Sequence, residues 1–175
     1  MRIVVPGRVE THILSGMTER MHFEHNIVGG DFTRAGYASS QVKKALKTLD
    51  VDMAIIKRTV VATYEAEVNV VAHACNGMMI VDIDGSTIQV VIQDEGPGIE
   101  DVEQAMVEGF STASSEVREM GFGAGMGLSN MKKNADSLHI ESEPGKGTKV
   151  EILMALDGRG EGEVSSRKKE VRSKG

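Results

Sequence analysis

The chain has 175 residues and a formal net charge of −6, from 26 acidic and 20 basic residues. This length suits one domain with its own core, and the acidic balance argues against nucleic-acid binding, which needs clustered Lys and Arg. One cysteine, Cys75, excludes an internal disulfide and fits a reducing compartment, and no apolar run reaches the ~18–20 residues of a membrane span.

The N-terminal part of the chain is predicted to hold one strand and one helix. Residues 1–20 have charges scattered among apolar residues and are no signal peptide, so we treat them as an extension of uncertain status. A strand is predicted over residues 22–28. Ser39 or Ser40 is predicted to cap a helix that runs to Leu49 with its apolar residues on one stripe.

The next segment is predicted to form a long helix and a hairpin. The helix covers residues 52–74, and Gly77 is expected to end it. Residues 78–82 and 87–93 alternate apolar and polar side chains and are rich in β-branched residues, which is typical of strands. The turn signal at Asp84-Gly85 joins them.

The C-terminal part combines short helices, a loop and a second hairpin. Helices are predicted over residues 101–107 and 126–135. Between them, residues 109–124 are small, polar and Gly-rich, which favours a mobile loop. Strands over 138–142 and 148–156 are predicted to form the last hairpin.

These elements predict an α/β (α+β) fold. It is a two-layer sandwich of a mixed, mostly antiparallel sheet covered on one face by helices. We place the domain at residues 21–156. Residues 157–175 are Gly-rich and charged with few apolar residues, so we expect a flexible tail.

The first candidate motif lies on the long helix. Glu65, Asn69 and His73 are spaced four residues apart and therefore share one face. An amide oxygen is a hard ligand that suits Mg²⁺, and a carboxylate can accept a proton from a hydroxyl. By itself the pattern is weak, because a polar stripe is usually just the wet side of a helix.

The second motif is D-E-G-P-G-I, residues 94–99, directly after a predicted strand. Asp94 could accept a hydrogen bond from an exocyclic amine such as that of adenine. Gly96 and Gly98 would let a flat base approach the backbone. The alternative reading is a turn that ends the strand.

Two further motifs are rich in glycine. G-F-G-A-G-M-G-L, residues 121–128, runs into a predicted helix, and alternating glycines can turn successive N–H groups toward phosphate oxygens. G-K-G-T, residues 145–148, lies in the last hairpin and would by itself be only a turn.

In this order and at these intervals, the four motifs resemble the N box, the two glycine boxes and the final hairpin of the GHKL ATP-binding superfamily. The resemblance covers about residues 25–156. It implies a histidine-kinase-like ATPase fold in which ATP lies between the helices and a Gly-rich lid.

Within the superfamily, Glu65 is the discriminating residue, because sensor histidine kinases usually carry Asn there. The topoisomerases, chaperones and mismatch-repair proteins share the Glu but have further domains, which we do not expect here. G-F-S-T at residues 109–112 and the run E-S-E-P-G-K-G-T-K-V resemble the anti-sigma factors and switch serine/threonine kinases.

The resemblance implies a role for each matching residue. Glu65 would be the general base, Asn69 the Mg²⁺ ligand and Asp94 the reader of adenine, with Gly98 beneath the base. The hydroxyl of Thr148 would support the aspartate. The other implied nucleotide contacts are Gly96, Ile99, Gly121, Gly123, Gly125, Met126, Gly127 and Leu128, and Lys132 or Lys133 could reach a phosphate.

The expected function is that of a cytoplasmic, ATP- and Mg²⁺-dependent serine/threonine kinase of the anti-sigma type. Its partners would be a STAS-like antagonist that carries the acceptor hydroxyl, and a sigma factor. Two alternatives remain open, an ATP-responsive anti-sigma module without catalysis and a detached histidine-kinase catalytic domain. A homodimer also remains open.

Overall fold

An antiparallel sheet of six strands forms one layer of the described chain, which comprises residues 10–12, 20–119 and 121–156 of a computed structural model. The strand order is β1-β2-β3-β4-β6-β5. The bounds are β1 Glu10–His12, β2 Arg20–Val28, β3 Asn76–Ile83, β4 Thr87–Asp94, β5 Ser137–Glu143 and β6 Gly147–Ala155. Because β6 lies between β4 and β5, the second hairpin joins the first through its last strand.

The predicted fold class and both hairpins are confirmed. The sheet is more uniform than expected, since every pair of neighbouring strands is antiparallel. Strand β1 was not predicted; it falls within the segment assigned to the extension and pairs with the first residues of β2. The remaining residues of that extension, and the predicted tail over 157–175, lie outside the described residues.

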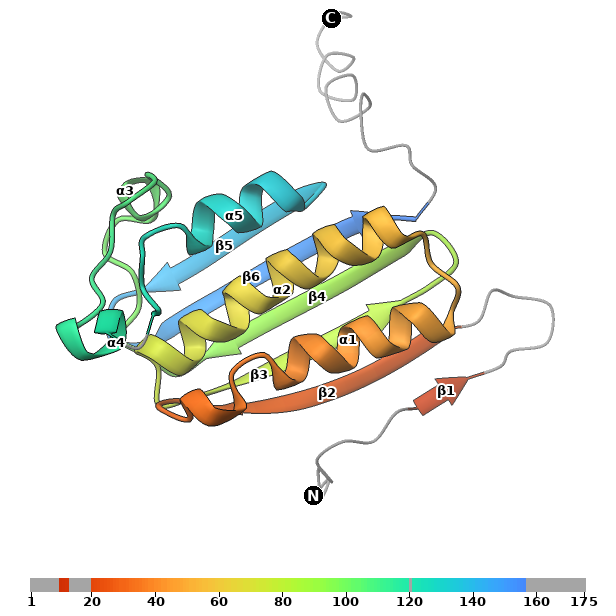
Figure 1. Ribbon diagram of the computed structural model, residues 1–175, viewed down its shortest axis with the longest axis horizontal. Helices are drawn as coiled ribbons and strands as arrows, with labels where there is room; N and C mark the ends of the chain where they lie inside the picture. Colours follow the sequence, from red (N-terminus) through yellow and green to blue (C-terminus); the bar gives the residue numbers. More distant parts are fainter. Residues whose placement is uncertain (1–9, 13–19, 120, 157–175) are drawn as a thin grey trace, which may run out of the picture.

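Three helices cover one face of the sheet: α1 (Tyr37–Thr48), α2 (Met53–His73) and α5 (Gly127–Asn134). In Figure 1, α2 runs across the middle of the sheet with α1 on one side and α5 on the other. The short helices α3 (Val102–Ala105) and α4 (Ser115–Glu119) lie toward the end of the sheet where α2 ends. None of the described helices is long and apolar enough to cross a membrane.

The start of α1 differs from the prediction. Neither Ser39 nor Ser40 caps the helix; it begins at Tyr37 after Gly36, which has a φ of +90°. The acceptors come instead from α2, where the buried carboxylate of Glu67 accepts from the backbone N–H groups of Ala38 and Ser39 at 3.0 and 2.9 Å. A tertiary contact therefore replaces the local cap that the sequence suggested.

The two ends of α2 are determined by different features. The predicted start of the helix at residue 52 is confirmed: Asp52 is the N-cap, and its side chain accepts from the backbone N–H of Ala54 at 2.7 Å. Gly77 does not end the helix, because the chain is already extended at Ala74 and Gly77 belongs to β3. The glycine is needed for packing, since an added Cβ would lie 2.8 Å from a methyl group of Val70.

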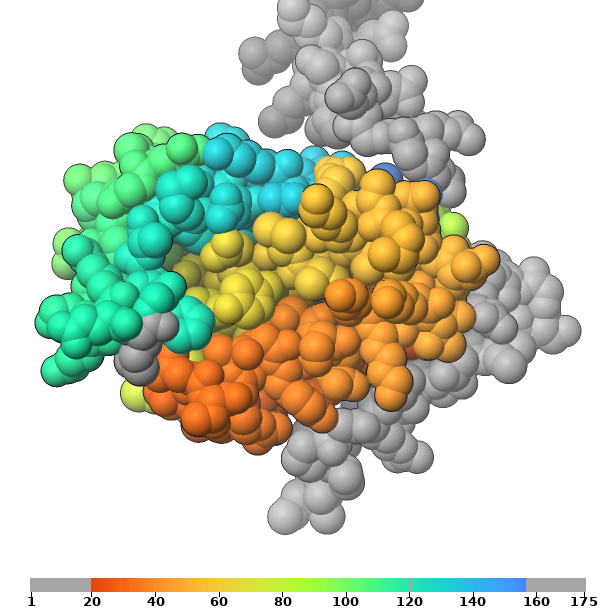
Figure 2. All heavy atoms as spheres, viewed as in Figure 1, coloured from red at the N-terminus to blue at the C-terminus, as the bar shows by residue number. Residues whose placement is uncertain are grey.

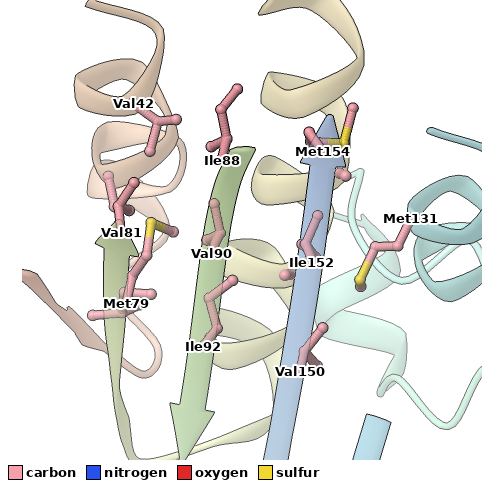
Figure 3. Packing of buried hydrophobic residues seen from close by; sticks show 14 of the residues in the cluster. Val42, Met79, Val81, Ile88, Val90, Ile92, Met131, Val150, Ile152 and Met154 are labelled. Carbon is pink, nitrogen blue, oxygen red and sulfur yellow. The ribbon is translucent and has the colours of Figure 1, made fainter. Parts of the chain in front are cut away.

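The hydrophobic core fills the space between the sheet and these helices (Figure 3). Alternate residues of β4 and β6 point toward the helices, as expected for strands with one solvent-facing side. Three methionines are fully buried, and their flexible side chains fill space in this core. The hydrophobic residues of the described chain with no exposed surface are Val42, Leu46, Ala62, Met79, Val81, Ile88, Val90, Met131, Ile152 and Met154.

Candidate nucleotide-binding site

Asp94, the last residue of β4, is held by two backbone groups. Its Oδ1 accepts from the N–H of Gly96 at 2.8 Å and from the N–H of Thr148 at 3.2 Å. No described residue donates to Oδ2. One carboxylate oxygen therefore fixes the side chain, and the other stays available for an external donor.

Burial raises the pKa of the Asp94 carboxyl, and the two backbone N–H groups act in the opposite direction. A carboxylate that has lost water is a stronger hydrogen-bond acceptor, because the local dielectric is lower than that of water. The site thus bears an energetic cost without a ligand, and a donor from a ligand would offset that cost.

The loop after Asp94 packs tightly against the turn between β5 and β6. Gly98 has a φ of +73°, and an added Cβ would lie 2.3 Å from the carbonyl oxygen of Glu143. The turn returns the contact, since the N–H of Gly145 donates to the carbonyl of Pro97 at 2.7 Å. The motifs at residues 94–99 and 145–148, distant in sequence, therefore form one wall.

Ser142 on β5 is also part of this wall. Its Oγ accepts from the N–H of Ile99 at 2.8 Å and lies 2.8 Å from the hydroxyl of Thr148. The predicted hydroxyl of Thr148 thus contacts Ser142, while its backbone N–H holds Asp94. Ser142 was not predicted as a site residue, although strand alternation places it on the same face as the inward Leu138 and Ile140.

A second cluster lies on α2, where Glu65 and Asn69 face the start of α5. A Cβ added at Gly127 would lie 3.2 Å from Asn69 Oδ1 and 3.5 Å from Glu65 Oε2. The glycine therefore lets the first turn of α5 approach both polar groups. This brings the N-terminus of a helix, which favours anions, against a carboxylate and an amide oxygen.

Helix α2 connects the two clusters along a single face. Its last turns bring His73 within electrostatic reach of Asp94: partial burial lowers the pKa of His73, and the Asp94 charge opposes that shift. The predicted stripe of Glu65, Asn69 and His73 therefore runs along this face of α2, from the residues that meet Gly127 toward Asp94. Figure 2 shows the middle of α2 exposed between α1 and α5 on this side of the molecule.

The segment predicted as a mobile loop contains helix α4 and folds back on itself. The N–H of Gly109 donates to the carbonyl of Gly125 at 2.9 Å. Gly125 has a φ of +74°, and an added Cβ would lie 2.5 Å from the carbonyl carbon of Gly109. Across the site, the ring of Phe122 packs on Phe32 with centroids 5.2 Å apart. The second glycine-rich motif, residues 121–128, is thus held by Gly109 at one side and by Phe32 at the other.

The remaining predicted contacts occupy different surroundings. Met126 is the N-cap of α5, whereas the side chain of Leu128 is buried in the core. Gly121 and Gly123 both have positive φ, in the loop before α5. Of the two lysines considered for phosphate, Lys133 forms an ion pair with Glu108 and Lys132 is exposed.

The donor set can be compared with the needs of Mg²⁺. Within the described residues, no group of three His, Cys, Asp or Glu could hold a metal ion by itself. Mg²⁺ in nucleotide sites usually takes few protein ligands, together with water and phosphate oxygens. The single amide oxygen of Asn69, next to a glycine that leaves room for phosphates, fits that pattern.

A helical layer over an antiparallel sheet, with a carboxylate, an amide and a glycine box around one end of α2, defines the class of nucleotide-binding α/β sandwiches. Over residues 54–158 the chain matches the family of histidine kinase-, DNA gyrase B-, and HSP90-like ATPases. The chain belongs to this family, and within it to the branch of anti-sigma regulatory kinases.

The relatives that support this assignment have two names, anti-sigma F factor and serine/threonine-protein kinase RsbT. The anti-sigma F factor of Thermoanaerobacter sp. (strain X514) is 40% identical over 52% of this chain and 64% of its own length. That of Clostridium perfringens (strain SM101 / Type A) is 31% identical over 66% of this chain and 83% of its own. The serine/threonine-protein kinase RsbT of Bacillus subtilis (strain 168) is 28% identical over 72% of this chain and 90% of its own length.

Proposed function

We propose that this chain is an ATP- and Mg²⁺-dependent serine/threonine kinase that phosphorylates a partner protein in a partner-switching system. The observation that carries the proposal is the approach of Gly127 to Asn69 and Glu65, at 3.2 and 3.5 Å from an added Cβ. It brings together an acceptor for a proton, a ligand for a metal ion and the start of a helix that favours phosphate.

At the adenine end, Asp94 Oδ2 would accept from the exocyclic amine of the base. Gly96 and Gly98 would shape the wall beside the base, because added Cβ atoms there would meet Asp94 and Glu143, and Ile99 would contribute apolar surface. Ser142 and Thr148 would keep the wall rigid through their hydrogen bonds to Ile99 and Asp94.

At the phosphate end, bound ATP and Mg²⁺ would supply the γ-phosphoryl group and the cation that neutralises its charge. Asn69 Oδ1 would hold the metal ion. The backbone N–H groups between Gly121 and Leu128 would donate to phosphate oxygens, which needs no covalent chemistry from the protein. Glu65 would accept the proton of the acceptor hydroxyl as the phosphoryl group is transferred to its oxygen.

The acceptor would be a Ser or Thr on a STAS-like antagonist, and a sigma factor would be the second partner. The kinase name of one relative supports the transfer step. The anti-sigma factor names of the others support a second candidate, an ATP-responsive module that binds a sigma factor without catalysis. We place the protein in the cytoplasm, where both partners would be found.

The test is phosphate transfer from radiolabelled ATP to purified STAS-domain proteins of the source organism, each assayed separately. We expect Mg²⁺-dependent labelling of a Ser or Thr in one of them, and much slower labelling by Glu65→Gln. ATP binding measured by calorimetry should persist in that variant, because Glu65 is not proposed to contact the adenine ring. ATP binding without transfer would favour the non-catalytic module, and no binding by the wild type would contradict both candidates.

A further inference from the structure

Helix α5 makes one polar contact with the carboxylate that we propose as the base. The side-chain nitrogen of Asn130 lies 2.7 Å from Glu65 Oε1, in a partly buried position. An ionised carboxylate can only accept, so the amide presents its NH₂ group to it. A hydrogen bond to a charged group is among the stronger ones available to a neutral side chain.

This bond divides the two carboxylate oxygens between two tasks. Oε1 is occupied by Asn130, whereas no described residue donates to Oε2. Oε2 is the oxygen that faces Gly127, at 3.5 Å from an added Cβ. A carboxylate held at one oxygen cannot rotate freely, so the other keeps a fixed direction toward the glycine box.

Asn130 is itself held in place by α5. Its backbone N–H donates to the carbonyl of Met126 at 2.8 Å, and its carbonyl accepts from the side chain of Asn134 at 2.8 Å. It lies one turn after Gly127, and the next residue, Met131, is anchored in the core with no exposed surface. The helix that follows the glycine box therefore also orients Glu65.

We propose that Asn130 is a positioning residue that orients Glu65 for proton transfer and ties that orientation to the first turns of α5. The inference rests on the proposed function, because it concerns the base of that reaction. Asn130 would act through Glu65 and not on the nucleotide. Its loss should slow transfer and leave ATP affinity unchanged.

The test is a double-mutant cycle with Asn130→Ala, Glu65→Gln and the double variant, and with Asn26→Ala, the same substitution at an exposed asparagine of β2, as the control. We expect Asn130→Ala to lower kcat by about tenfold or more, the size expected for a hydrogen bond to a charged group. KM for ATP should not change, and the double variant should be no slower than Glu65→Gln alone. Independent, multiplying effects would overturn the inference, as would equal loss of ATP affinity in Asn130→Ala.

A second measurement separates this inference from the proposed function. The side-chain amide signals of Asn130 in ¹H–¹⁵N spectra should shift in Glu65→Gln, where a neutral group replaces the charged acceptor, and stay in place in Asn26→Ala. If Glu65→Gln leaves them unshifted, the positioning contact is absent and the inference fails, even in an active kinase. If the wild type shows no transfer activity but the Asn130 signals still shift in Glu65→Gln, the kinase proposal and the proton-transfer role are contradicted, whereas the contact between Asn130 and Glu65 is confirmed.

Discussion

Replacing Asp94 by Asn separates the proposed binding role of this residue from its place in the fold. The two backbone N–H groups of Gly96 and Thr148 need an acceptor, and the amide oxygen of Asn can supply it. The NH₂ group of Asn would then occupy the position of Oδ2 and face the exocyclic amine of adenine. Two donors would oppose each other where a charged acceptor now lies.

The size of the effect follows from the group that is lost. A hydrogen bond to a charged acceptor is worth roughly 1.5–3 kcal/mol, so Kd for ATP should rise by about 10- to 150-fold. The stability of the folded state should rise or stay the same. Burial raises the pKa of Asp94, and the neutral amide removes the cost of a buried charge. Weaker binding with an unchanged or higher Tm is therefore the expected signature.

The assay is calorimetric titration with Mg²⁺-ATP alongside thermal unfolding. Asp82→Asn is the matched control, since it makes the same charge change on the neighbouring strand β3 at a side chain that is 57% exposed. ATP affinity of Asp94→Asn within about twofold of the wild type, a difference too small for a lost charged contact, would refute the adenine role. A parallel fall in affinity and Tm would indicate that Asp94 acts only through the fold.

The raised pKa of Asp94 also predicts that ATP affinity falls on acidification at a higher pH than for an ordinary aspartate, and calorimetry across pH should show this dependence in the wild type but not in Asp94→Asn. Without ligand, stability depends on pH in the opposite sense to ATP affinity. The Asp94 carboxyl binds its proton more tightly in the folded state than in the unfolded chain, so its contribution to stability falls as pH rises through its folded pKa. Glu67→Ala leaves two N–H groups of α1 without their acceptor and should cost roughly 2–5 kcal/mol in chemical denaturation, with a smaller loss for Glu67→Gln. Gly98→Ala should destabilise by about 2 kcal/mol or more and weaken ATP binding, since it combines a positive φ with a clash against Glu143; a wild-type Tm would contradict that geometry. Ser142→Ala should raise Kd for ATP several-fold with little change in kcat, as measured by titration and steady-state kinetics, because it loosens the wall and not the base.

The sequence predicted those parts of the fold that depend on local patterns. The alternation in β3, β4 and β6 and the helical pattern from residue 52 were sufficient to locate both hairpins and the start of α2. The start of α1 could not be found in this way, because its cap is Glu67, 28 residues away from Ser39. The sequence alone does not show whether a nearby serine or a side chain from another helix accepts from the first N–H groups of α1.

The candidate site shows the same division. The spacing of Glu65 and Asn69 places them on one helical face, and the structure brings Gly127 against both. Asn130 and Ser142 could not be assigned, because each acts on a group that lies far away in the chain. Their contacts depend on which helix and which strand pack side by side, and that follows from the strand order and not from spacing.

The strand order has a consequence for the synthesis of the protein. Strand β6 lies between β4 and β5, so until residues 147–155 have left the ribosome the sheet has an open edge at β4 and β5 has no neighbour. Thr148, which holds Asp94, arrives with that same strand. Domains tend to fold as their segments emerge, and here the nascent chain cannot complete the proposed adenine site before β6 is inserted. Capture of ATP by ribosome-bound chains of increasing length should therefore begin abruptly, once β6 is free.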